Sequence, residues 1–319
     1  MTHTEAAAWL RDHDGYLILT HKRPDGDTLG CAAGLCRALR QAGKTAYVLT
    51  NPEVTRTYFD DVAPYFAPED YQPETVISVD TATLGLLPDN AKEYQDRIAF
   101  AFDHHPSYEG FAPESCADPA CAACGELIFR VCRELGPITA EIAKPLYVAV
   151  STDTGCFVYS NTTADTHRVA AELMGYGDFS KEVNKRCFRT KSLKRLKLES
   201  LLVEEMEVYE DGLIAVTALS LDQMERVGAS ESDAEDLAAF VGQVEGVKIS
   251  ATIRELRPGE CKISLRTDAS VLNATKTCAL LGGGGHAAAS GATVDGTVEE
   301  AKQAILQAIW NVRNQGLAD

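Results

Sequence analysis

Residues 16–27 decide the fold of the N-terminal part of the chain. They read Tyr16-Leu-Ile-Leu-Thr-His21-Lys-Arg-Pro-Asp25-Gly-Asp27. The apolar, β-rich run at 16–20 predicts a buried strand. A turn shaped by proline and glycine follows, and residues 27–42 then carry apolar side chains at helical spacing. A buried strand that leads through a polar turn into a helix is typical of a parallel α/β sheet.

The same alternation continues further along the chain. Short β-rich runs at 45–49, 75–79 and 98–102 predict three more strands. The apolar run at 145–150 fits either a buried helix or a strand, and residues 163–174 fit a helix. We therefore expect an α/β domain with a parallel sheet over residues 1–180.

A basic stretch then separates this domain from a second one. Residues 181–197 hold eight lysines and arginines against one glutamate. We expect a connector helix over 181–208, either as a solvated link or as a positive element that attracts an anionic substrate. From 209 to 319 the pattern predicts a smaller C-terminal α/β domain. Its elements are a strand at 213–217, a helix at 234–241, a hairpin of 248–256 with 261–266, a glycine-rich loop at 282–285 and a helix at 297–312.

The composition narrows the class of protein. The chain has 319 residues with a net charge of −17, and 45% of them are hydrophobic. This composition is globular, and the negative charge disfavours a grip on long duplex nucleic acid. A small phosphorylated substrate at a local site remains compatible with it.

Targeting signals and cysteine usage indicate where the protein works. The longest uncharged run, 277–294, holds five glycines and a histidine, so it is a poor membrane span. No signal peptide is visible at the N-terminus. The pair Cys121 and Cys124 lacks the second pair that a zinc site needs, so we expect the ten cysteines to be thiols. These features predict a cytoplasmic protein that does not contact a membrane.

Acidic residues and histidines follow the predicted core elements of the first domain. They are His21, Asp25 and Asp27 after the first strand, Asp80 after the third, Asp103, His104 and His105 after the fourth, and Asp153 after the run 145–150. In open α/β sheets, ligands bind at the carboxyl ends of strands. A capping role for Asp27 on the following helix would explain one aspartate and not the whole set. Carboxylates gathered at one edge repel one another unless cations lie between them.

This set contains enough ligands for two divalent cations that share one carboxylate. The ligands are His21, Asp25, Asp27, Asp80, His104 and Asp153. Carboxylate and imidazole ligands without thiolate suit Mn²⁺ or Mg²⁺, with iron or cobalt as alternatives. Two such ions about 3.5–4 Å apart favour in-line phosphoryl displacement.

The four groups of acidic residues and histidines, at 21–27, 80, 103–105 and 153, resemble motifs I to IV of the DHH phosphoesterase superfamily. The segment Gly282-Gly-Gly-Gly-His286, with Ser290-Gly291 behind it, resembles the signature of the associated DHHA1 domain. Together the two signatures cover nearly the whole chain. The short two-domain form is most similar to bacterial oligoribonucleases (nanoRNases) that also dephosphorylate 3′-phosphoadenosine 5′-phosphate (pAp). The resemblance implies a metal-binding DHH domain at 1–180 and a substrate-binding DHHA1 domain at 209–319.

The resemblance also implies roles for individual residues. His21, Asp25 and Asp80 would hold one Mn²⁺, and Asp27, Asp80, His104 and Asp153 the second, with Asp80 as the bridge. Asp103 would orient the histidines, and His105 would contact the scissile phosphate or protonate the leaving oxygen. In the second domain, a phosphate far from the metals would be bound by Arg266, Gly283, Gly284, Gly285 and His286.

The expected activity is hydrolysis of short single-stranded oligoribonucleotides to 5′-mononucleotides, and of pAp to AMP. A phosphodiesterase for linear or cyclic dinucleotides, such as pApA or cyclic di-AMP, is the main alternative. A manganese pyrophosphatase would share motifs I to IV, but the glycine-rich segment at 282–286 argues against it. A non-catalytic nucleotide-binding module is disfavoured because the ligand set is complete. The sequence leaves a homodimer open.

Overall fold

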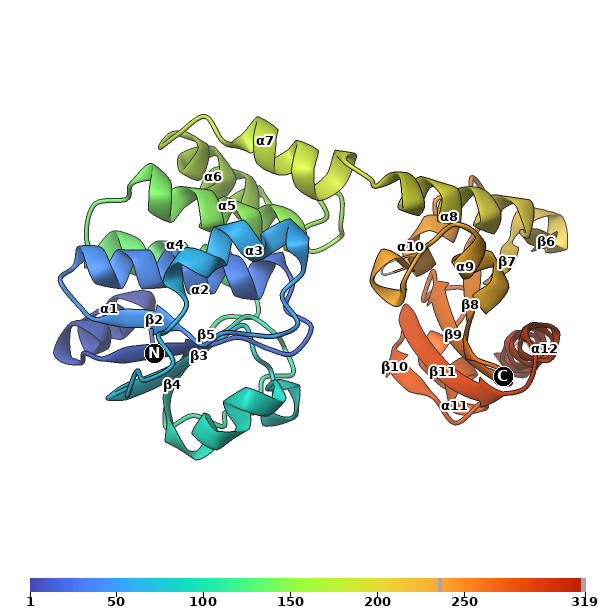
Figure 1. Ribbon diagram of the computed structural model, residues 1–319, viewed down its shortest axis with the longest axis horizontal. Coiled ribbons are helices and arrows are strands. Elements are labelled where there is room, and N and C mark those ends of the chain that lie inside the picture. The colour runs from blue at the N-terminus through green and yellow to red at the C-terminus, as the bar shows by residue number, and fades with distance from the viewer. Residues whose placement is uncertain (235–236, 317–319) are drawn as a thin grey trace. The chain divides into compact units, whose positions relative to one another are not determined.

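The computed structural model describes residues 1–234 and 237–316 and divides into two compact units (Figure 1). The first unit is Met1–Thr190 and the second is Lys191–Asp319. Among the described residues, no helix combines the length and the apolar character that a membrane crossing requires.

The first unit is built on a five-stranded sheet in the order β2-β1-β3-β4-β5, with every neighbouring pair parallel. Its strands are β1 (Tyr16–Leu19), β2 (Ala46–Val48), β3 (Thr75–Val79), β4 (Ile98–Asp103) and β5 (Glu114–Ala117). The predicted parallel sheet is therefore confirmed. The edge strand β5 was not anticipated, because its short run Glu-Ser-Cys-Ala is partly exposed and lacks an apolar alternation.

The α-helices of this unit lie over one face of its sheet (Figure 1). They are α1 (His3–Asp12), α2 (Gly26–Gln41), α3 (Arg56–Val62), α4 (Cys124–Leu135), α5 (Ala140–Asp153), α6 (Ala164–Met174) and α7 (Ser180–Asn184). Tyr16 and Ile18 face the core beneath these helices, whereas Leu17 and Leu19 face a smaller core on the other side. That second core is covered by the 3₁₀ segments η2 (Leu84–Leu86) and η3 (Asp89–Arg97), while η1 (Ala63–Tyr65) follows α3.

The run at 145–150 belongs to the helix α5. All six of its side chains are buried. Its apolar pattern is therefore continuous, and periodicity alone could not distinguish a helix from a strand.

Helices α2 and α5 approach each other closely at Gly30. A Cβ atom there would overlap the carbonyl oxygen of Pro145 and lie 2.9 Å from the amide nitrogen of Ala149. Glycine permits this contact because it has no side chain. The amino end of α2 carries Asp27 and the carboxyl end of α5 carries Asp153, so this contact helps to set the distance between the two aspartates.

The second unit contains a mixed six-stranded sheet in the order β10-β11-β9-β8-β7-β6. Its strands are β6 (Glu207–Tyr209), β7 (Ile214–Leu219), β8 (Ile249–Arg257), β9 (Glu260–Thr267), β10 (Gly284–His286) and β11 (Ala289–Asp295). One face packs on α11 (Ala274–Ala279) and α12 (Val298–Gly316). Around the other face lie α8 (Leu193–Glu204), α9 (Leu221–Arg226) and α10 (Leu237–Val241), with η5 (Glu210–Gly212) and η6 (Glu231–Ala234) in the connections. A second α/β domain is thus confirmed.

The predicted hairpin is the antiparallel pair β8 and β9. The loop expected at 282–285 ends in the short strand β10, which pairs with β11. Of the helix expected at 234–241, residues 237–241 form α10, and residues 235–236 lie outside the described residues.

The stretch expected to form one connector helix is interrupted. α7 continues into a short π-helix, η4 (Lys185–Arg189), and α8 begins only at Leu193. Thr190 is extended, and the Ser192 hydroxyl accepts a hydrogen bond from the Arg195 amide at 3.0 Å. This serine caps a new helix, which explains why the helical pattern does not continue unbroken through 190–192.

Gly30→Ala is expected to lower the free energy of unfolding by about 1–3 kcal/mol, because the new methyl group would push α2 away from α5. Chemical denaturation followed by circular dichroism measures this change. Gly85→Ala is a suitable control, because the closest atom to its Cβ would be Thr83 Oγ1 at 3.5 Å. A Gly30→Ala protein as stable as the wild type would show that the close contact imposes no constraint.

Candidate metal centre

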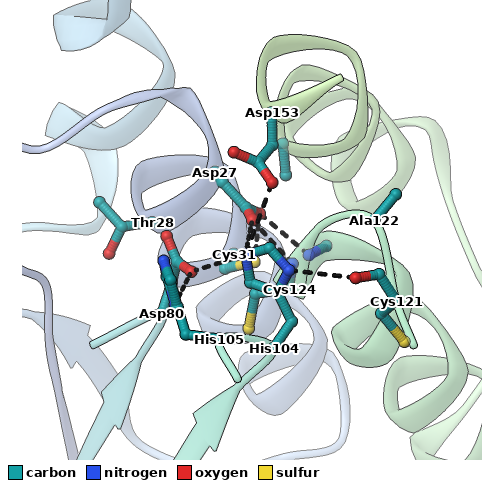
Figure 2. A network of polar contacts seen from close by, with 12 residues as sticks. Asp27, Thr28, Cys31, Asp80, His104, His105, Cys121, Ala122, Cys124 and Asp153 are labelled. Carbon is teal, nitrogen blue, oxygen red and sulfur yellow. Dashed lines mark hydrogen bonds and ion pairs between the residues drawn. The ribbon is translucent and has the colours of Figure 1, made fainter. Parts of the chain in front are cut away.

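The predicted ligands of the first unit gather at the carboxyl ends of β1, β3 and β4 and of the helix α5. Figure 2 shows four of them, Asp27, Asp80, His104 and Asp153, with their side chains directed toward one another. The strand order reverses direction between β1 and β3, because β2 lies on one side of β1 and β3 on the other. Loops at such a switch point diverge and leave a crevice where ligands bind. His21 follows β1 and Asp80 follows β3 at this position.

The turn after β1 places its two aspartates in different roles. Asp25 caps α2, since its Oδ1 accepts hydrogen bonds from the amides of Asp27 at 3.0 Å and Thr28 at 3.1 Å. The interpretation of Asp27 as the helix cap is therefore wrong. A Cβ at Gly26 would lie 2.6 Å from Cγ2 of Thr152, so the glycine lets the end of α5 pack against this turn.

Asp27 is buried and is held by another helix. Its Oδ2 accepts a hydrogen bond from the Cys124 amide at 2.7 Å, and its Oδ1 accepts one from the Gly125 amide at 2.9 Å. The Cys31 thiol donates to Oδ1 at 3.2 Å. Free amides at the amino end of α4 thus stabilise this carboxylate. Cys31 lies one helical turn after Asp27, so its contact could have been predicted from the sequence spacing. The contacts with the amides of α4 could not, because they join distant segments of the chain.

The two inner histidines are oriented by backbone carbonyl groups. His21 Nδ1 lies 2.9 Å from the Lys22 carbonyl oxygen, and His104 Nδ1 lies 3.1 Å from that of Cys121. A carbonyl oxygen only accepts, so each Nδ1 carries the proton. The lone pair of each Nε2 is then available to a cation, as is usual for histidines that bind metals.

Both Nε2 atoms face carboxylate oxygens at similar distances. His21 Nε2 lies 3.6 Å from Asp25 Oδ1 and 3.7 Å from Asp80 Oδ2. His104 Nε2 lies 3.5 Å from Asp80 Oδ1, 3.5 Å from Asp153 Oδ2 and 3.7 Å from Asp27 Oδ2. These separations are too long for good hydrogen bonds. Two ligand atoms about 2.1 Å from one divalent ion lie about 3–3.6 Å apart, so the spacing fits a shared cation.

The ligand atoms form overlapping groups, each within 4.8 Å. The groups are His21 with Asp25 and Asp80, Asp27 with His104 and Asp153, and Asp80 with His104 and His105. Asp80 connects them, because its Oδ2 faces His21 and its Oδ1 faces His104. The structure therefore brings together all six residues considered as metal ligands.

Asp80 occupies an unfavourable position for a carboxylate. Its backbone is left-handed, with φ of +53°. Its side chain is buried, and Oδ1 has no hydrogen-bond partner among the described residues. A strained backbone and a buried oxygen without a hydrogen bond both cost free energy, unless another interaction compensates for the cost. A cation bound to Oδ1 fits this position.

Proton affinities reflect the crowding of negative charge. Burial raises the pKa of Asp27 well above its usual range, and the charges of Asp80 and Asp153 raise it further. Burial also raises the pKa of Asp153, to about 6. Burial lowers the pKa of His21, but the carboxylates of Asp25 and Asp80 outweigh it and raise the value to about 11. Without cations, His21 is therefore protonated at neutral pH, and Asp27 binds a proton more readily than a free aspartate.

Asp103 contacts one of the two adjacent histidines. Its Oδ1 accepts a hydrogen bond from the His105 amide at 2.6 Å and lies 2.9 Å from His105 Nδ1. This contact raises the pKa of His105 to about 9. His104 is instead oriented by the carbonyl of Cys121, which sequence reasoning did not identify. The His105 side chain is 40% exposed, so it can reach a substrate.

The predicted phosphate-binding residues share one corner of the second sheet. Arg266 in β9 is paired with Ala289 in β11, which is paired with His286 in β10. Directly paired residues project from the same face, so the small alanine leaves space between the two larger side chains. Residues 284–286 are exposed. This corner offers a guanidinium group, an imidazole and main-chain amides.

Comparison with known proteins gives consistent matches. Residues 16–150 match the DHH family, N-terminal domain, and residues 214–314 match the DHHA1 domain. The bifunctional oligoribonuclease and PAP phosphatase NrnA of Thermus thermophilus is 33% identical over 92% of this chain and 88% of its own length. The protein of the same name from Bacillus subtilis is 26% identical over 91% of this chain and 93% of its own.

A solved structure with high similarity covers both units. An exopolyphosphatase-related protein from Bacteroides fragilis has a TM-score of 0.86 and 25% identity over 98% of this chain and 97% of its own. A more distant relative, the cyclic-di-AMP phosphodiesterase PdeA of Listeria monocytogenes, is 26% identical over 94% of this chain but only 48% of its own length. On the strength of both domain matches and of the Thermus relative, the chain belongs to the DHH family and carries a DHHA1 domain behind its DHH domain.

Proposed function

We propose that this protein is a metal-dependent phosphoesterase that hydrolyses short oligoribonucleotides to 5′-mononucleotides and pAp to AMP. The observation that carries the proposal is the pair of ligand groups joined by Asp80. The names of the Thermus and Bacillus relatives, oligoribonuclease and PAP phosphatase, support the choice of substrates.

In this proposal, one cation is held by His21, Asp25 and Asp80, and the other by Asp27, Asp80, His104 and Asp153. Mn²⁺ suits this mixture of oxygen and imidazole ligands, and Mg²⁺ or Co²⁺ are alternatives. When bound, such a pair offsets the charge of the phosphoryl oxygens and lowers the pKa of water.

His105 is the residue of the site that can move a proton. Asp103 holds its Nδ1, and the partial exposure of the ring lets Nε2 meet a substrate. We assign to His105 either a hydrogen bond to the scissile phosphate or protonation of the leaving oxygen. Asp103 stabilises the protonated imidazole in both cases.

Arg266 and His286 are proposed to bind another phosphate of the substrate. A guanidinium group can form two parallel hydrogen bonds with phosphate oxygens. The exposed Gly284 and Gly285 are proposed to add main-chain donors. The predicted role of Gly283 as a donor is not supported, because its amide already donates to the Cys278 carbonyl at 2.9 Å. This corner belongs to the second unit, whereas all six proposed metal ligands belong to the first.

Dinucleotide hydrolysis is the second candidate, favoured by the similarity to the Listeria phosphodiesterase. A panel of RNA 2- to 5-mers, pAp, pApA and cyclic di-AMP in Mn²⁺ separates the two activities. We expect RNA and pAp to be hydrolysed with the higher kcat/KM. A protein that prefers cyclic di-AMP would contradict the assignment.

We place the protein in a reducing compartment, as the cytoplasm is. All ten cysteines lie in the described residues and all are free thiols. Several approach one another without forming a disulfide, including Cys31 and Cys124 beneath Asp27. Disulfides are rare in reducing compartments, which is consistent with this assignment.

Asp80→Asn is expected to reduce Mn²⁺-dependent release of nucleoside monophosphate from a labelled RNA trimer at least 100-fold. The substitution keeps the shape of the side chain but removes the charge shared by both ligand groups. Asp89→Asn, at an exposed aspartate of the same unit, is the control and should retain activity. Full activity of Asp80→Asn would contradict the arrangement around a shared carboxylate.

Metal affinity is expected to rise with pH, by more than tenfold between pH 5 and pH 7.5. Below about pH 6 Asp153 holds a proton, and the raised pKa of Asp27 acts in the same direction. A cation must displace these protons, so their release favours binding at higher pH. Isothermal titration calorimetry in two buffers measures both the affinity and the number of protons released. An affinity independent of pH would contradict this account of the site.

Arg266→Ala is expected to raise the KM for an RNA trimer by about tenfold, as loss of a charged hydrogen bond predicts. Mn²⁺ affinity and kcat should change little, because the residue lies outside the unit that carries the metal ligands. Arg257→Ala, at an exposed arginine of the neighbouring strand β8, is the matched control. Loss of Mn²⁺ binding in Arg266→Ala would show that the residue is misplaced.

A further inference from the structure

The segment that follows Asp153 has an unusual backbone. Gly155, Cys156 and Phe157 are all left-handed, with φ of +56°, +59° and +67°. The conformation is unfavourable for the two residues that are not glycine. Such a turn persists only where the surrounding structure determines it.

Hydrogen bonds fix this turn relative to the candidate metal centre. The Cys156 amide donates to the Ser151 carbonyl at 2.7 Å. Asn161 Nδ2 donates to the carbonyl of Asp153 at 3.0 Å and to that of Ala122 at 2.9 Å. Ala122 follows Cys121, whose carbonyl orients His104. The segment 155–161 is therefore bonded to the backbone of Asp153 and to the backbone next to Cys121, the partner of His104. Asp153 and His104 belong to the same group of candidate ligands.

The turn separates its aromatic side chains. Phe157 packs into the core, with its ring stacked on His167 at 5.2 Å between centroids. Tyr159 is turned outward and is 58% exposed, beside Val158, which is 79% exposed. The Tyr159 hydroxyl makes no hydrogen bond within the parts of the chain that the structure describes. The exposed ring thus contributes little to the fold.

Tyr159 lies close to Asp153 in space. A Cβ at Gly155 would be 2.5 Å from the Tyr159 ring, so the ring rests on this glycine. Gly155 is two residues after Asp153, so their Cα atoms are at most about 7 Å apart. The exposed ring is therefore near enough to contact the nucleoside of a nucleotide whose phosphate lies at the metal ligands.

We propose that Tyr159 is a stacking platform for a nucleobase of the substrate. The inference rests on the proposed hydrolysis of nucleotides and extends it to the base, which the metal ligands do not contact. Aromatic rings stack on all four bases, so the platform would favour nucleotides without selecting a sequence. It would also disfavour inorganic pyrophosphate, which has no base to stack.

The test compares an RNA dinucleotide with its abasic counterpart, which has the same backbone and no bases. Tyr159→Ala should raise the KM for the RNA dinucleotide by about tenfold and leave kcat within about twofold. The KM for the abasic dinucleotide should not change. Tyr159→Phe should resemble the wild type, because the ring remains. Tyr176→Ala, at another exposed tyrosine of this unit, is the matched control.

A second readout does not depend on hydrolysis. The fluorescence of 2-aminopurine riboside 5′-monophosphate is quenched when its base stacks on an aromatic ring. Addition of wild-type, Tyr159→Phe or Tyr176→Ala protein should quench the probe, and addition of Tyr159→Ala protein should not.

The outcomes separate this proposal from the function on which it rests. Equal quenching by Tyr159→Ala and wild type, or an equal rise of KM for the abasic dinucleotide, would overturn the platform. A change of oligomeric state in Tyr159→Ala, with KM unchanged, would identify the patch as a protein contact and would also overturn it. If the wild type quenches the probe through Tyr159 but hydrolyses no RNA, the platform stands and the proposed activity fails.

Discussion

The mutual repulsion of buried carboxylates is the constraint on which the first unit depends. Asp27 and Asp80 are buried and Asp153 is mostly so, and all three face the same imidazole nitrogen of His104. A folded chain tolerates such crowding only if protons, amide dipoles or cations offset the charge. The first two of these responses appear among the described residues of the unit. The raised pKa of Asp27 favours its neutral, protonated form. The amides at the amino end of α4 donate hydrogen bonds that stabilise its charged form.

The architecture keeps these opposed groups at a fixed spacing. Gly26 and Gly30 allow α2 to lie against α5, so the aspartates at the ends of the two helices cannot move apart independently. Carbonyl groups determine which nitrogen of His21 and His104 faces the carboxylates. The left-handed backbone of Asp80 adds strain at the residue that joins both ligand groups. The site is therefore prepared before any cation arrives, which reduces the reorganisation that binding requires.

The sequence predicted the features that depend on local pattern. Strands β1, β3 and β4 were identified because their apolar runs end sharply in polar residues, and the same ends marked Asp80 and His104. Contacts between distant segments left no such pattern. The amides that hold Asp27 belong to the distant helix α4. The Asp25 cap is local, with the amides of Asp27 and Thr28 as partners, and it was missed because both aspartates lie where α2 begins. The left-handed turn after Asp153 was missed because Cys156 and Phe157 adopt a conformation that their own propensities oppose.

Net charge finally explains why short substrates suit this chain. At −17, the protein repels each additional phosphate of a long RNA. Favourable contacts come from a few local sites, namely the proposed cations, the corner of Arg266 and His286, and the proposed platform at Tyr159. Each of these sites would contact a single phosphate or base of the substrate. Every further nucleotide would add repulsion without adding a contact, so affinity should stop rising once these sites are filled. The distribution of charge therefore favours short oligonucleotides over long ones.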